Sequence, residues 1–530
     1  MINTAMGTNG MVTAPHHMAA EAGRDVLREG GSAVEAMVSA AATIAAAYPH
    51  MNAIGGDGLW LISSPGQTPV GIDACGSAAR LASPDWYRSQ GLSAIPARGP
   101  NAALTVPGTV AGWQAALSQP GASSGRLPLA RLLEPAAALA RDGVPVTAGQ
   151  EELTRNKLAE LVDVSGFAET FLTDSGDVMP RGSRLAQPRL GETLEQLGRA
   201  GLDDLYHGQL ARSIARDLET LGSPLRLADL EAYRPAVVEP LGLRIAGTQL
   251  YNMPPPTQGL ASLMILGIFD RLGVEEGEGF AHLHGLIEAT KQAFRVRDSH
   301  VTDPEYMQVS AETFLENHRL SSAARDIDVA NAAPWPHPAA PGDTIWMGAI
   351  DSEGRAVSFI QSIYWEYGSG VVLPESGVLM QNRGMSFGLD TDHPQALAPG
   401  RRPFHTLNPA MAKFDDGRDM VYGTMGGEGQ PQTQAAVFTR YAYFDTPLQE
   451  AVTAPRWLLG RTWGDASTSL KLESRFSPVL VDRLRSAGHV VETAKEFDSM
   501  MGHAGAIVRH SNGLLEGATD PRSDGKVATY

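Results

Sequence analysis

The spacing of apolar positions divides the chain into a mainly helical first part and a strand-rich last part. Residues 16–48 have the pattern of two helices broken at Gly30-Gly31, and Ser32 with Glu35 has the spacing of a capping box that starts the second helix. From about Val106 to Leu320, apolar residues recur every three or four positions, as in Leu129–Ala140, Gly208–Leu221 and Gly259–Arg271. This middle part is therefore predicted to be mostly helical.

Alternating or continuous apolar runs predict strands near the start of the chain and after residue 343. The predicted strands are Leu59–Ser63, Val70–Asp73, Thr344–Ile350, Arg355–Ser362, Met411–Phe414 and Met420–Gly423. Residues 326–343 hold four prolines and five alanines without periodicity, so we expect an exposed linker that tolerates cleavage. The two parts on either side can form separate domains or the unequal layers of one sandwich.

Composition narrows the class of protein. The 530 residues are 43% hydrophobic and 19% charged, which indicates a globular chain with a packed core. A formal net charge of −17 without a cluster of Lys or Arg argues against a nucleic-acid partner. The one cysteine, Cys75, excludes an internal disulfide and fits a reducing compartment. The N-terminus lacks the pattern of a secretory signal, and Ala33–Ala47 is too short to cross a bilayer. We therefore expect a cytoplasmic protein without a membrane segment.

Thr344 is the candidate nucleophile, because it lies directly between the linker and a predicted β-hairpin. Cleavage of the Asp343–Thr344 bond would leave a threonine that carries its own base, the new α-amino group. The ordinary pKa of such an amine, about 7.7–8.0, suits proton transfer near neutral pH. This chemistry needs no metal and no cofactor. Taken alone, a Gly-Asp-Thr run before a strand is more often an ordinary turn.

Several motifs spread along the chain carry a family resemblance. They are AEAGRDVLREGGSAVEAMVSAA, the GGDG run, TVPGTVAGW, ESGVLMQN, GTMGGEGQPQTQ, APRW and the closing DPRSDGKVATY. In their order and spacing they resemble the γ-glutamyltransferase family of N-terminal nucleophile hydrolases. The resemblance implies an α+β fold, a four-layer αββα sandwich, in a precursor that cuts itself. The large subunit would be residues 1–343 and the small subunit residues 344–530, intertwined in one structural domain.

The same resemblance implies roles for catalytic residues. Thr344 would attack first the Asp343 carbonyl and later a substrate amide. Gly426 and Gly427 would supply the backbone N–H groups that stabilise the oxyanion, and glycine allows both groups a close approach. Ser362 matches the family's second hydroxyl residue, which orients the nucleophile, although the family usually has threonine there.

The substrate-binding positions depart from the family pattern. An arginine that clamps the α-carboxylate of a glutamyl donor is replaced by a run that begins at Cys75, and an asparagine is replaced by Tyr364. Arg383 stands where the family has an acid for the donor's amino group, and His405 with Thr406 replaces paired serines. A site that loses the acid and gains Arg383 favours an anion without an amine, since an unpaired ligand charge is costly to bury. Arg383 would hold its carboxylate in a bidentate fork.

These departures most resemble the family branch that hydrolyses oxamate to oxalate and ammonia in purine-nitrogen salvage. The predicted function is therefore hydrolysis of a small carboxylate-bearing amide through an ester on Thr344. One alternative on the same machinery is γ-glutamyl hydrolysis or transfer, and another is a glutaryl or cephalosporin acylase. The alternative from another class is an uncleaved, non-catalytic binding protein. The predicted partners are a small anionic amide and the two subunits of one precursor, and a homo-oligomer of processed heterodimers stays open.

Overall fold

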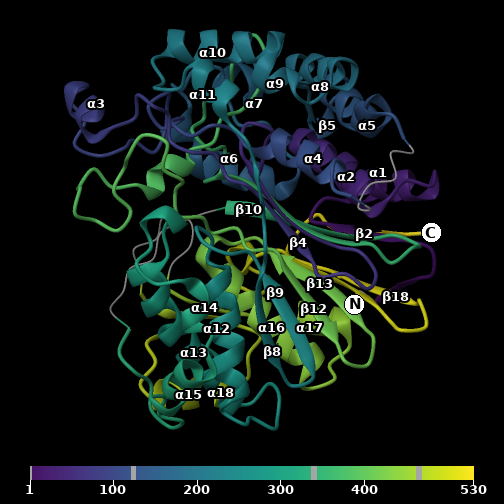
Figure 1. Cartoon of the computed structure of the whole chain (residues 1–530), viewed down its shortest axis with the longest axis vertical. Helices are drawn as coiled ribbons and strands as arrows, with labels where there is room; N and C mark the ends of the chain where they lie inside the picture. Colours follow the sequence, from purple (N-terminus) through teal and green to yellow (C-terminus); the bar gives the residue numbers. More distant parts are fainter. Residues whose placement is uncertain (1–2, 121–126, 336–342, 461–467) are drawn as a thin grey trace.

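The computed structural model describes residues 3–120, 127–335, 343–460 and 468–530, with only the backbone of Asp343. Two seven-stranded antiparallel sheets are stacked at the centre and covered by helices on both outer sides (Figure 1). This arrangement is the expected four-layer αββα sandwich.

Sheet I carries the candidate nucleophile. Its strands, in spatial order, are β19 (Lys526–Thr529), β2 (Met11–Ala14), β10 (Asp343–Ile350), β11 (Ala356–Tyr364), β3 (Asp57–Ser63), β4 (Val70–Ala74) and β7 (Ala236–Val238). Sheet II consists of β1 (Ala5–Gly7), β18 (Leu515–Thr519), β17 (Ala504–Arg509), β13 (Asp419–Thr424), β12 (Ala410–Phe414), β9 (Thr248–Asn252) and β8 (Leu241–Ile245). Both sheets combine strands from before and after residue 343. The two parts of the chain therefore build one domain together.

Helices from the first part of the chain cover sheet I. They are α1 (His17–Arg28), α2 (Ala33–Ala47), α3 (Pro84–Ser89), α4 (Thr109–Leu117), α5 (Leu129–Asp142), α6 (Ala148–Leu161), α7 (Phe167–Phe171), α8 (Pro188–Ala200), α9 (Asp204–His207), α10 (Gln209–Leu221) and α11 (Leu227–Ala232). Helix α2 packs directly on β10 and β11. All of its residues are buried, which explains why it is apolar on every side.

Helices from both parts of the chain cover sheet II. They are α12 (Gly259–Asp270), α13 (Phe280–His300), α14 (Ala311–Phe314), α15 (Asn317–Arg325), α16 (Gln430–Ala442), α17 (Leu448–Thr453) and α18 (Pro478–Ser486). Two small sheets lie outside the central pair: β14 (Trp457–Leu459) with β15 (Leu470–Glu473) and β16 (Val491–Ala494), and β5 (Val144–Pro145) with β6 (Arg184–Leu185). Short 3-10 helices are η1 (Pro304–Tyr306), η2 (Arg383–Ser386), η3 (Gly427–Gly429) and η4 (Ser499–Met501). Within the described ranges, no helix combines the length and apolar composition that crossing a bilayer requires.

The two sheets meet in an apolar layer centred on Trp346. The indole is buried, and its Nε1 donates a hydrogen bond to Ser358 Oγ at 2.9 Å. Gly423 on the facing strand makes room for it, since a Cβ there would lie 2.2 Å from the indole Cδ1 atom. Trp346, two residues after Thr344, therefore serves the contact between the sheets.

Most expected elements are present, and three strands that were not predicted interrupt the helical stretch. The two early helices, the capping box of Ser32 with Glu35, the hairpin after residue 343 and the strands at 410–424 are confirmed. The stretch 106–320 is mostly helical, as expected, but the strands β7, β8 and β9 interrupt it. In β8 buried and exposed residues alternate, a period of two that strands impose. Of the predicted linker, residues 336–342 lie outside the described residues, and most of residues 326–335 are partly or fully exposed.

Candidate active site

Thr344 lies on β10, where the register with β11 is irregular. Asp343 pairs with Tyr364, but Ile345 pairs with Gln361, so β11 has one extra residue opposite Thr344. This β-bulge brings two hydroxyl groups together, and Thr344 Oγ1 donates a hydrogen bond to Ser362 Oγ at 3.2 Å. Both side chains are buried. The two hydroxyl groups that the family resemblance pairs, those of Thr344 and Ser362, are therefore in hydrogen-bonding contact.

Tyr364 joins this hydroxyl pair to Arg383. Its backbone N–H donates to Ser362 Oγ at 2.9 Å, while its ring lies 3.8 Å from the centre of the Arg383 guanidinium. Tyr364 has a φ of 83°, which is unfavourable for a bulky side chain. Such backbone strain persists only where the surroundings impose it, and it clusters at functional sites.

The Arg383 guanidinium is buried without a full set of partners. Nη2 donates to Thr406 Oγ1 at 3.3 Å, whereas Nε and Nη1 have no hydrogen-bond partner among the residues that the structure describes. Burial lowers the pKa of Arg383 from its ordinary value. Unsatisfied N–H groups on a buried cation are costly and suit an anionic ligand. The arginine is therefore placed as a carboxylate-binding group would be.

His405, Cys75 and Asp57 form the adjoining wall. His405 Nε2 lies 3.0 Å from Asp57 Oδ2, and the Leu407 N–H approaches His405 Nδ1 at 3.4 Å. Nδ1 is then the acceptor and Nε2 carries the proton that Asp57 accepts. Burial lowers the pKa of His405 well below its ordinary value and raises the pKa of the Cys75 thiol well above its own. Both groups are therefore uncharged near neutral pH.

The Gly426-Gly427 turn begins where β13 ends and leads into α16. Both glycines have positive φ, 116° and 53°, as the sequence reasoning allowed. Gln258 holds this turn beside the substrate wall, because its Nε2 donates 2.7 Å hydrogen bonds to the carbonyls of Gly427 and Thr406. Glu428, the residue after Gly427, forms a buried ion pair with Arg297 at 2.6 Å.

The structure thus brings the predicted site residues to one end of sheet I and the adjoining sheet II. Gly426 and Gly427 are connected to the other residues through Gln258. Sequence reasoning missed four residues: Asp57, Gln258, Arg297 and Glu428. Asp57 was visible as the one charged residue of the apolar strand β3. Gln258, by contrast, lies among ordinary turn residues and has no sequence signal.

Two groups of three potential metal ligands occur among the described residues, and neither fits a metal well. One is Asp57 with Cys75 and His405, and the other is His284 with Glu288 and His489. In the first group Asp57 is already hydrogen-bonded and the thiol is protonated. In the second group Lys291, 2.7 Å from Glu288, already supplies a positive charge, and the two imidazoles lie 2.9 Å apart as a hydrogen-bonded pair.

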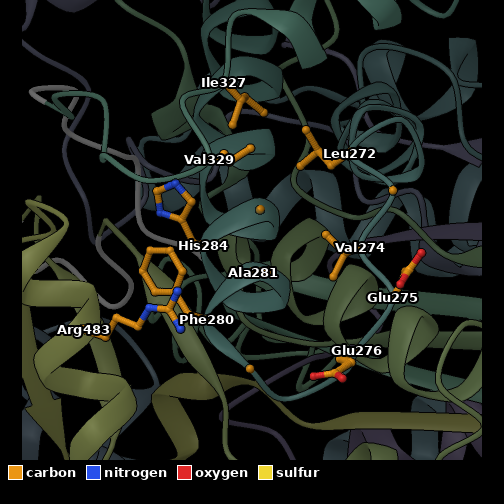
Figure 2. Close-up of a pocket in the computed structure, with 13 residues that line it drawn as sticks. Leu272, Val274, Glu275, Glu276, Phe280, Ala281, His284, Ile327, Val329 and Arg483 are labelled. Atoms are coloured by element: carbon orange, nitrogen blue, oxygen red, sulfur yellow. The ribbon is translucent and has the colours of Figure 1, made fainter.

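A pocket of about 530 Å³ lies elsewhere, between the start of α13 and α18 (Figure 2). Arg483 lies over the Phe280 ring, which stacks on His284. None of the candidate catalytic residues lines this pocket. It is therefore separate from the site around Thr344.

Comparison with known proteins decides the family. The sequence model of gamma-glutamyltranspeptidase matches residues 19–530. The chain belongs to the γ-glutamyltranspeptidase family. Within this family it is 54% identical over 531 residues to the oxamate amidohydrolase proenzyme of Klebsiella pneumoniae subsp. pneumoniae, with all of both chains covered. It is 38% identical to the glutathione hydrolase-like YwrD proenzyme of Bacillus subtilis, with 99% of each chain covered. The crystal structure of cephalosporin acylase from Bacillus halodurans superimposes with a TM-score of 0.91 at 30% identity, covering 100% of this chain and 97% of that one.

Proposed function

We propose that this member of the γ-glutamyltranspeptidase family is an autoprocessing amidohydrolase with Thr344 as its nucleophile. In the precursor, Thr344 Oγ1 bonds to the Asp343 carbonyl carbon while the bond from that carbon to the Thr344 nitrogen breaks. The hydroxyl proton passes to this nitrogen, which becomes the α-amine. Water then hydrolyses the ester, leaving a carboxylate on Asp343 and restoring the Thr344 hydroxyl. The products are residues 1–343 and 344–530.

The mature Thr344 acts on a substrate amide in the same way. Its α-amine takes the hydroxyl proton as Oγ1 attacks, and passes the proton to the departing nitrogen. Ser362 Oγ, within 3.2 Å of the nucleophile, keeps the hydroxyl aligned. The N–H groups of the Gly426-Gly427 turn stabilise the oxyanion, and each such donor is typically worth about 2.7–4 kcal/mol.

The substrate is a small amide with a single carboxylate, and the buried Arg383 guanidinium carries this proposal. Among the described residues, its Nε and Nη1 have no hydrogen-bond partner, and the Tyr364 ring covers its face. A ligand carboxylate would therefore complete its hydrogen bonds. The side chains that lie around this guanidinium are those of His405, Thr406 and Cys75. These three side chains carry no charge, so Arg383 is the principal attraction for an anion.

Oxamate is the substrate that we propose, hydrolysed to oxalate and ammonia. The full-length similarity to the oxamate amidohydrolase proenzyme supports this choice. Oxamate places its amide carbonyl directly beside its carboxylate, and contacts through Ser362 and Tyr364 link Thr344 to Arg383. Purine-nitrogen salvage in the cytoplasm is the setting that this substrate suggests.

Two measurements test the proposal together. Sequencing the N-terminus of the smaller polypeptide should identify Thr344, and the purified protein should release ammonia from oxamate. A panel of γ-glutamyl anilides, glutaryl amides and cephalosporins provides the comparison. Turnover of any of these in preference to oxamate would replace the proposed substrate, and an active protein that stays uncut would remove the nucleophile.

A further inference from the structure

Asp57 is a buried carboxylate within the substrate site, on the same sheet as the nucleophile. It begins β3 and lies directly opposite Ser362 of β11 in the strand register. Opposed residues of an antiparallel pair point to the same face of a sheet. The carboxylate and the orienting hydroxyl therefore share the face on which the substrate must bind.

The oxygens of this carboxylate are already committed to donors from the protein. Oδ1 accepts hydrogen bonds from the Gly76 N–H at 2.9 Å and from Gln381 Nε2 at 3.1 Å, and Oδ2 accepts from His405 at 3.0 Å. The Gly108 N–H lies close to it but donates to the Gly56 carbonyl at 2.8 Å. A carboxylate offers about four acceptor positions. Asp57 is therefore poorly placed to pair with the ammonium group of a γ-glutamyl donor.

Charge balance then opposes an ionised Asp57 once an anion is bound. Arg383 interacts electrostatically with Asp57 and is fully buried, as Asp57 is. A substrate carboxylate beside Arg383 makes a neutral pocket if Asp57 carries a proton, and an excess buried negative charge if it does not. Unpaired buried charge is strongly disfavoured.

We propose that the Asp57–His405 pair takes up one proton when the anionic substrate binds, which makes Asp57 a specificity-determining residue that selects small carboxylates without an ammonium group. The inference rests on the proposed function and assigns to one pair the choice between substrate classes. The added proton binds Asp57 Oδ2, which keeps its 3.0 Å hydrogen bond from His405 Nε2–H, and the two groups therefore titrate as a pair.

The remaining ionisable groups around Asp57 leave this pair as the site of uptake. Those that interact with it are Cys75, Asp73, Tyr206, Tyr233 and Arg383. Burial raises the pKa of the thiol and of both phenols, so these three stay neutral, and Asp73 is paired with Arg402 at 2.9 Å.

The direction of the pH dependence follows from the free protein. Burial raises the pKa of Asp57 to about 7, with the Gly76 and Gln381 hydrogen bonds and the charge of Arg383 acting in the opposite direction. Below pH 7 the pair is protonated and ready for an anion. Above pH 7 each bound anion must bring a proton, so affinity falls by up to tenfold per pH unit.

The experiment measures KM and kcat for oxamate with the processed protein between about pH 5.5 and 8.5, where the substrate carboxyl stays ionised. Wild type should show a constant KM at low pH and a rising KM above about pH 7. Asp57→Asn should show a KM that no longer depends on pH. The α-amine of Thr344 titrates in the same range, so a rise that persists in Asp57→Asn would assign the effect to the amine and overturn the inference.

A control and a second measurement complete the test. Glu288→Gln changes another buried carboxylate, far along α13 and paired with Lys291, and should keep the wild-type profile. Proton uptake on binding oxalate is measured by titration calorimetry of wild type in buffers of different ionisation enthalpy, which does not depend on a variant that folds. About one proton at pH 8 supports the inference, and none overturns it. If oxamate is not hydrolysed at any pH, the proposed function fails instead.

Discussion

Replacing Arg383 by methionine should make the free protein more stable and nearly abolish its activity. The Arg383 side chain is buried, and its Nε and Nη1 have no hydrogen-bond partner in the described part of the chain. Each unsatisfied buried N–H costs about 1–3 kcal/mol, and methionine removes both. The losses are the contact with the Tyr364 ring, about 0.5–2 kcal/mol, and one long hydrogen bond to Thr406, about 0.5–1.5 kcal/mol. The attraction between Arg383 and Asp57 is also lost, and Asp57 can take up a proton in its place. The net expectation is a gain of about 1–3 kcal/mol in the free energy of unfolding.

The same substitution removes the proposed carboxylate contact. Two charge-assisted hydrogen bonds are worth about 1.5–3 kcal/mol each. Their loss should lower kcat/KM for oxamate by about 10²- to 10⁴-fold. Autoprocessing should continue, because the hydrogen bond between Thr344 and Ser362 does not involve Arg383.

Urea unfolding at neutral pH and initial rates of ammonia release measure both effects, after a denaturing gel shows that each variant is processed. Arg401→Met is the matched control, since that guanidinium donates to Thr302 Oγ1 and to the carbonyls of Pro394 and Ala396. We expect this control to lose stability. An Arg383→Met protein that is less stable than wild type and keeps its KM would show that the guanidinium is structural, and would refute the reasoning.

Three further predictions concern the nucleophile and the oxyanion turn. Thr344→Ala should remain a single chain without amidase activity on a denaturing gel and in ammonia assays, and self-cleavage of this variant would disprove the role of its hydroxyl. Gly426→Ala should lower kcat by about 10²-fold, because a φ of 116° strains any other residue. Gly222→Ala is the control: Gly222 has a φ of 93° at the exposed end of α10, so this variant should lose similar stability and keep its kcat. Arg297→Met should lower the free energy of unfolding by about 3–5 kcal/mol, because it removes the cation that faces the buried Glu428 carboxylate. Adding Glu428→Leu should recover most of that loss in urea unfolding, and a double variant as unstable as the single one would contradict the ion-pair argument.

Local features of the sequence were enough to predict many elements and to single out Thr344 as a candidate nucleophile. The capping box at Ser32, the apolar runs on both sides of residue 352 and the position of Thr344 behind a proline-rich segment depend only on neighbours in the chain. Family motifs added the oxyanion glycines and the orienting Ser362. Short-range patterns are informative because backbone propensity and side-chain period act over a few residues.

Only the tertiary structure decided how the substrate site is charged. Asp57 and His405 are 348 positions apart, and their hydrogen bond exists because β3 begins beside the segment that precedes β12. The unsatisfied guanidinium of Arg383 and the strained Tyr364 likewise depend on what packs around them. Burial and long-range contacts set the pKa values and unpaired donors of a site, and no local pattern in a sequence records either. The candidate nucleophile could therefore be proposed from the chain alone, whereas the contacts and burial of the acid beside Arg383 could not.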